Sequence, residues 1–70
     1  MAVNEVTFTV RELQSEDESR RIRTELENVE GVMGIEVDDE SGETTIRFDH
    51  DLTSEEAVTR AVHDLGYEIE

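Results

Sequence analysis

Residues 7–22, TFTVRELQSEDESRRI, begin with the pattern of a strand and end with the pattern of a helix. Val6, Phe8 and Val10 alternate with threonine, which is the period of a strand with one buried face. We therefore predict a first strand over residues 3–11 and a change of secondary structure soon after it.

The helix that follows is predicted from apolar residues at helical spacing. Ile22, Leu26 and Val29 recur three or four residues apart, with charged residues between them. Gly31 stands where a C-terminal cap is expected, because glycine readily adopts the left-handed conformation that ends a helix. The predicted helix covers residues 16–29.

Two further runs of alternating residues predict a β-hairpin. The segment DDESGE between them, residues 38–43, contains Gly42 and other residues that are common in turns. The alternating residues are Met33, Ile35 and Val37 before the turn and Thr44, Ile46 and Phe48 after it.

A second helix and a short last strand complete the chain. Thr53 precedes Glu56 by three residues, the spacing of a capping box at a helix start, and Gly66 stands where this helix should end. The expected apolar face of the helix consists of Ala57, Val58, Ala61, Val62 and Leu65. Tyr67 and Ile69 alternate beyond the glycine and predict the last strand.

The predicted order of elements is βαββαβ, in a single domain over residues 1–70. Right-handed crossovers in this order place both helices on one face of a four-stranded antiparallel sheet. The predicted fold class is therefore α+β, a ferredoxin-like sandwich. Hydrophobic residues make up 34% of the chain, and their periodic placement favours a folded domain despite the high charge.

The charge of the chain is strongly acidic. Twenty acidic residues face six basic ones, all of them arginine, and the net charge is -14. At molar ionic strength the Debye length falls to about 3 Å and the repulsion between acids is largely screened, so we interpret the composition as adaptation to high salt. The same balance disfavours nucleic acid and anionic membranes as partners, since both select clustered lysine or arginine.

The chain contains no cysteine, which excludes disulfides, thiolate metal ligands and a cysteine nucleophile. Its first residues, MAVNEVTF, lack the basic start and long apolar run of a signal peptide. No run approaches the roughly 18 apolar residues of a membrane helix. We expect a soluble cytoplasmic protein.

Two segments carry a resemblance to a known family. EGVMGIEVD, residues 30–38, and SEEAVTRAVHDLGY, residues 54–67, resemble in this order the heavy-metal-associated domain, the module of copper chaperones and metal ATPases. The resemblance covers nearly the full chain and implies a ferredoxin-like fold. The other matching positions are Thr7, Phe8, Val10, Ile22, Leu26, Val29, Phe48, Asp49 and Thr53.

The metal loop of that family differs in this chain. In the family, the loop after the first strand reads Gly-Met-Thr-Cys-x-x-Cys, and its two thiolates hold a soft metal such as copper(I) or zinc. The same places hold Glu12, Leu13, Gln14, Ser15, Glu16, Asp17 and Glu18. Leucine keeps the apolar slot of the methionine, but both cysteines are replaced by oxygen side chains, which are poor ligands for copper(I). We therefore expect no soft metal and no cofactor.

Two interpretations of the replaced loop remain open. Ser15 and Glu18 have the spacing of a capping box at the head of a helix, and acids in the first turn favour the helix dipole. The alternative is a carboxylate site for a hard divalent cation such as calcium, magnesium or manganese. Its candidate ligands are Glu12, Ser15, Glu16, Asp17, Glu18 and His63.

The sequence contains no nucleophile paired with a base and no glycine-rich phosphate loop, so we expect no enzymatic activity and no catalytic residue. The leading interpretation is an accessory or interaction module, a monomer or weak dimer that binds another protein. A second alternative is a small-molecule regulatory module like the ACT domains. The open face of the sheet should be polar, without an aromatic platform for RNA, and should contain Thr7, Thr9, Glu36, Thr45 and Arg47.

Lowering the salt concentration is expected to unfold the chain, because unscreened acidic side chains repel one another in the compact state. The measurement is thermal unfolding followed by circular dichroism, from molar salt down to dilute buffer. Cooperative unfolding should be lost well below molar salt. A sharp and unchanged transition in dilute buffer would contradict the prediction.

Overall fold

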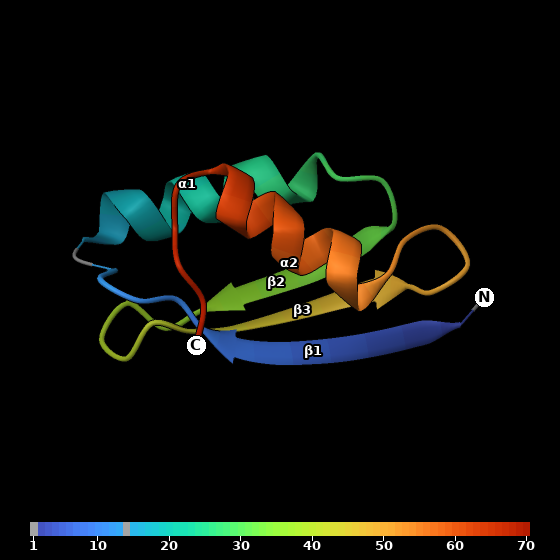
Figure 1. Ribbon diagram of the computed structural model, residues 1–70, viewed down its shortest axis with the longest axis horizontal. Helices are drawn as coiled ribbons and strands as arrows, with labels where there is room; N and C mark the ends of the chain where they lie inside the picture. The colour runs from blue at the N-terminus through green and yellow to red at the C-terminus, as the bar shows by residue number, and fades with distance from the viewer. Residues whose placement is uncertain (1, 14) are drawn as a thin grey trace.

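The structure is a computed structural model that describes residues 2–13 and 15–70, and it forms two layers (Figure 1). A sheet makes one layer and both helices cover the same face of it, as predicted. The elements are β1 (Val3–Thr9), α1 (Glu16–Glu27), β2 (Val32–Val37), β3 (Glu43–Asp49) and α2 (Glu55–Asp64).

The sheet is antiparallel in the order β1-β3-β2. Its β2–β3 register shifts between Val32 and Gly34, which marks a β-bulge. Because of this bulge, the predicted alternation of Met33 with Ile35 on the core face is wrong. Val32 pairs with Phe48 and packs against the core, whereas Met33 is 52% exposed.

The predicted fourth strand is wrong: in the described part of the chain the sheet has three strands. The last residues pair with β1 through one isolated bridge, Val10 with Ile69. Two hydrogen bonds flank it, Arg11 N–H to the Glu68 carbonyl and Glu70 N–H to the Thr9 carbonyl, both 2.8 Å. The last residues do run antiparallel to β1 as expected. They pair with the chain only around Val10, just after the end of β1, and form no ladder along the strand.

The core lies between the helices and the sheet. Its buried hydrophobic residues are Val6, Phe8, Val10, Ile22, Leu26, Ile46, Phe48, Val58 and Val62. Two polar residues are buried with them and both form hydrogen bonds. The Thr44 hydroxyl donates to the Gly42 carbonyl at 3.2 Å, and the Ser19 hydroxyl donates to the Ser15 carbonyl at 3.5 Å.

The helix ends differ from the prediction at two places. Helix α1 ends at Glu27 with Asn28 as its cap, two residues before the predicted end. The Asn28 side-chain amide donates to the Thr24 carbonyl at 3.2 Å, and this local bond competes with another turn of helix. Gly31 is therefore no cap; it has φ +94° in the following loop, packed against Leu52 and Thr53.

Helix α2 starts one residue later than its predicted capping box. Ser54 is the N-cap, and its hydroxyl accepts the Ala57 N–H at 3.1 Å, so the predicted pairing of Thr53 with Glu56 is wrong. The expected end of the helix is confirmed. Gly66 follows the cap and adopts φ +98°, the left-handed conformation that favours glycine.

Substitution of Gly42 by alanine should destabilise the fold by about 3 kcal/mol, because it combines backbone strain with a clash. Gly42 has φ +80°, and an added Cβ would lie against the carbonyl oxygen of Val10. Gly66→Ala is the matched control, since φ is +98° there but no atom lies within 4 Å of the added Cβ. It should cost only about 1 kcal/mol. Denaturant unfolding in high salt measures the stability of both variants. An equal loss of stability in the two would show that the clash with Val10 adds nothing.

Candidate functional site

The loop that replaces the metal loop lies at the end of the domain where β1, the hairpin turn and the last residues meet (Figure 1). The Val10 N–H donates to the Gly42 carbonyl at 2.9 Å, and the Arg11 N–H donates to the Glu68 carbonyl at 2.8 Å. These bonds hold the start of the loop against two segments that are distant in sequence. Leu13 packs partly buried against the core, so the predicted apolar slot is confirmed.

Ser15 is the N-cap of α1. Its hydroxyl accepts the Glu18 N–H at 3.2 Å, and its extended backbone (φ -152°) is typical of a cap. The serine half of the predicted capping box is confirmed. The hydroxyl that stands in the place of the first family cysteine therefore stabilises the helix start.

Glu18, in the place of the second cysteine, lines the same depression as Tyr67. The carboxylate of Glu18 and the guanidinium of Arg21 both act on the ionisation of the tyrosine hydroxyl. Partial burial, followed by the charge of Glu18, raises the pKa of Tyr67 above its ordinary value of 10.0, while Arg21 opposes the shift. The second ligand position of the family is thus occupied by a carboxylate that lies beside the last segment of the chain.

Glu12 adopts φ +58°, a left-handed conformation that is unusual for a residue with a side chain. It stands in the place of the family's glycine, to which this conformation costs nothing. For glutamate the cost is about 1–2 kcal/mol. The loop therefore starts with a conformation that suits glycine better than the glutamate that is present.

The loop borders an open depression of about 330 Å³. Its lining residues are Arg11, Glu12, Glu18, Gly66, Tyr67 and Glu68. Arg11 pairs with two of the last residues, with Glu68 at 3.5 Å and with Glu70 at 3.6 Å. Both ion pairs are exposed, so each contributes at most about 1 kcal/mol. The depression is polar and carries charges of both signs.

The structure does not bring the proposed cation ligands together. Within residues 2–13 and 15–70, no three His, Asp or Glu side chains converge so that they could hold a metal ion. Glu16 lies 3.8 Å from Arg20 one turn along the helix, and Asp17 is exposed. His63 is exposed in the last turn of α2 and does not line the depression.

Of the six candidate residues, Glu12 and Glu18 share the depression and Ser15 caps the helix. Gln14, which belongs to the replaced loop, lies outside the described residues. His50 lines a different depression, near the start of β1 and the start of α2.

Comparison with solved structures shows what this arrangement resembles. The structure of oxidized MerP from Ralstonia metallidurans CH34 is 28% identical and has a TM-score of 0.89, with 99% of this chain and 96% of that chain covered. A copper binding domain from HMA7, a P-type ATPase, is 26% identical with a TM-score of 0.88, covering 94% of this chain and 89% of that one. The resemblance to the heavy-metal-associated domain family is confirmed.

Another similar structure contains a bound metal. It is the mercury-bound form of MerP, the periplasmic protein from the bacterial mercury detoxification system, which is 29% identical with a TM-score of 0.81. It covers 99% of this chain and 96% of its own. No family model matches the sequence, and no curated protein matches it. The likeness therefore rests on structure, and this member of the fold contains no cysteine.

The contact between Glu18 and Tyr67 was not predicted from the sequence. Tyr67 was identified only as a residue of the last strand, and the two side chains lie far apart along the chain. One signal could have found the contact: a capping-box glutamate at the helix head and a lone tyrosine after the second helix reach the same end of this topology.

Within the described chain no helix has the length and apolar surface of a membrane crossing.

The pKa of Tyr67 is expected to lie above 10, and Glu18→Gln should lower it because one cause of the shift is the nearby carboxylate. The chain has one tyrosine and no tryptophan, so ultraviolet absorbance during a pH titration reports this group alone. Glu12→Gln, which removes a charge from the same depression, is the control and should shift the pKa less.

The same pKa shift sets a pH dependence of stability. Because the pKa of Tyr67 is raised by folding, its contribution to the free energy of unfolding is fully present below pH 10.0 and is lost as the pH rises through the folded-state pKa. Tyr67→Phe should abolish this part of the alkaline loss. An unshifted pKa in the folded chain would contradict the Glu18 contact.

Proposed function

We propose that this protein is a non-enzymatic interaction module of heavy-metal-associated fold that has lost soft-metal binding. It would bind another protein in place of carrying copper(I), zinc or mercury. The observation that carries the proposal is the Ser15 hydroxyl, which accepts the Glu18 N–H at 3.2 Å in the place where the family has its first thiolate.

The chemistry of the two replaced positions supports the loss of metal binding. Copper(I) and mercury(II) prefer soft sulfur ligands, and the chain has none from cysteine. Ser15 is used by the helix cap and Glu18 by the contact with Tyr67. A metal would have to break both interactions and would gain only oxygen ligands.

The shape of the surface supports a binding role over catalysis. The depression beside the loop is open and is lined mainly by charged side chains, two of which are joined in an ion pair. Enzyme sites are usually concave and largely apolar, with a few converging polar groups. A surface of this kind suits contact with another macromolecule.

The composition supports a salt-rich cytoplasm as the place of action. Among the described residues, Arg11, Arg20 and Arg60 form ion pairs with glutamates, and all of these pairs are exposed. Six arginines cannot neutralise twenty acids, so most acidic side chains depend on screening by salt.

The metal-binding half of the proposal is tested by NMR of the full chain in molar salt, with copper(I), zinc and calcium added in turn and amino acids added last. We expect no shift of the amide signals of residues 12–18. Shifts there with calcium at micromolar concentration would show a carboxylate cation site instead. Binding of amino acids between two copies would show an ACT-like regulatory module.

Restoring the thiolates provides a sharper test. We expect Ser15→Cys combined with Glu18→Cys to bind copper(I) or mercury(II), because Leu13 packs against the core in the family's apolar slot and the two positions have the spacing of the family's cysteines. Ser54→Cys with Ala57→Cys is the matched control, since it puts the same spacing at the head of α2. Equal affinity of both variants would show that the loop has no retained geometry, and metal binding by the unchanged chain would overturn the proposal.

A further inference from the structure

Among the residues that the structure describes, no strand lies beside the outer edge of β1 over most of its length. The flanking bonds of the Val10–Ile69 bridge are made by the backbone groups of Thr9 and Arg11. In an antiparallel strand alternate residues point their N–H and C=O groups to the same side. The odd residues Val3, Glu5 and Thr7 therefore direct theirs to this edge, where no other described strand pairs with them.

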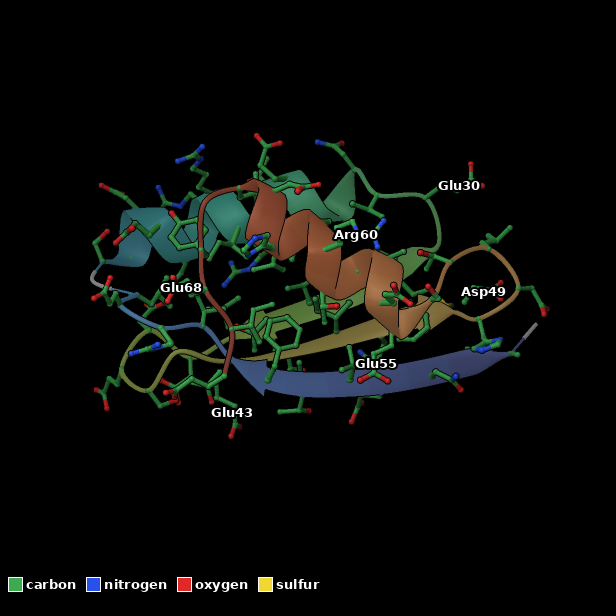
Figure 2. The ribbon with its side chains drawn as sticks, in the orientation of Figure 1. Glu30, Glu43, Asp49, Glu55, Arg60 and Glu68 are labelled. Carbon is green, nitrogen blue, oxygen red and sulfur yellow. The ribbon has the colours of Figure 1, made fainter. Side chains whose placement is uncertain are left out.

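A depression of about 390 Å³ lies next to this edge, between the start of β1 and the start of α2. Its lining residues are Asn4, Glu5, Phe48, His50, Ser54, Glu55 and Glu56. Figure 2 shows Glu55 at the first turn of α2, over β1. A long side chain from a strand laid along β1 would enter this depression with its apolar stem near Phe48 and its end near the glutamates.

The charges beside the edge are acidic and accessible. Glu5 is paired in register with Arg47 on β3, but the Arg47 guanidinium lies over Gly34 on β2, with one nitrogen 3.3 Å from the place of a Cβ there. Glu56 forms an ion pair with Arg60 at 3.2 Å. In the part of the chain that the structure describes, Glu5 and Glu55 lie in no such pair.

Apolar surface gathers at the same end of the domain. Val3 is 50% exposed and pairs in register with Asp49. This exposed side chain belongs to the strand with the unpaired edge, so it adds apolar contact area for a partner.

We propose that the outer edge of β1 binds an extended basic segment of a partner protein as an additional strand. The inference rests on the proposed interaction function and names its surface and the chemistry of its partner. Backbone groups of Val3, Glu5 and Thr7 would pair with the segment, and its arginine or lysine side chains would meet Glu5 and Glu55.

A second copy of this chain fits the edge less well. The antiparallel register that pairs residues 3–7 with themselves puts Glu5 opposite Glu5 of the other copy, and like charges directly opposite one another are unfavourable. Each copy also carries a net charge of -14. A basic segment removes both penalties.

The test uses a synthetic peptide of alternating arginine and valine, added to the full chain in molar salt and followed by NMR. Binding should shift the amide signals of Val3, Glu5 and Thr7 and slow their hydrogen exchange. The same peptide with N-methyl groups on alternate residues cannot donate to the edge and should not bind. A peptide of alternating glutamate and valine should bind more weakly than the arginine peptide.

Matched charge variants locate the contact. Glu5→Lys should weaken binding about fivefold or more, since a cross-strand attraction becomes a repulsion. Glu36→Lys makes the same change of charge on β2, away from this edge, and should leave binding unchanged.

The inference would be overturned by no shift at residues 3–7, by shifts confined to residues 11–18 and 66–68, or by self-association through β1 without peptide. None of them bears on the loss of soft-metal binding, which the metal titrations decide separately. Equal binding of the N-methylated peptide would also overturn it, because contact would then not use the strand edge.

Discussion

Packing of the two helices onto one face of the sheet is the interaction on which the rest of the structure depends. Ile22 and Leu26 of α1 and Val58 and Val62 of α2 are at most 1% exposed. Burial of each such side chain contributes about 1.5–3 kcal/mol. Because a chain of 70 residues has room for little more core than this, both helices must start and end at well-capped positions, and the many charged side chains must remain outside.

The start of α1 is where this requirement meets the chemistry of the fold family. A loop that holds a metal through two thiolates is stabilised by the metal, whereas a loop without thiolates needs another source of order. Ser15 supplies a helix cap, and Glu18 lies beside Tyr67 of the last segment. Glu12 keeps a left-handed backbone at a cost that glycine would not carry. The start of α1 is thus stabilised by a side-chain cap where the family has a metal ligand.

The same packing explains why the surface that remains suits a protein partner. Both helices lie on one face, so the other face and the edges of the sheet stay open (Figure 1). The tail meets β1 at Val10 only, which leaves the earlier backbone groups of that strand without a neighbouring strand among the described residues. Acidic side chains and Val3 border this edge. The edge offers hydrogen bonds to a partner, and the acidic side chains next to it favour a partner segment of opposite charge.

The sequence by itself determined what depends on short-range periodicity: the order of the first five helices and strands, most of the core-facing residues, the cap at Ser15, the helix end at Gly66 and the absence of thiolate ligands. Only the tertiary structure decided how far residues 67–70 pair with β1 and that Glu18 meets Tyr67. These contacts join segments that are distant along the chain, so they depend on how the layers pack. Local spacing carries no record of that packing, whereas helix and strand periods repeat within a few residues and can be read directly.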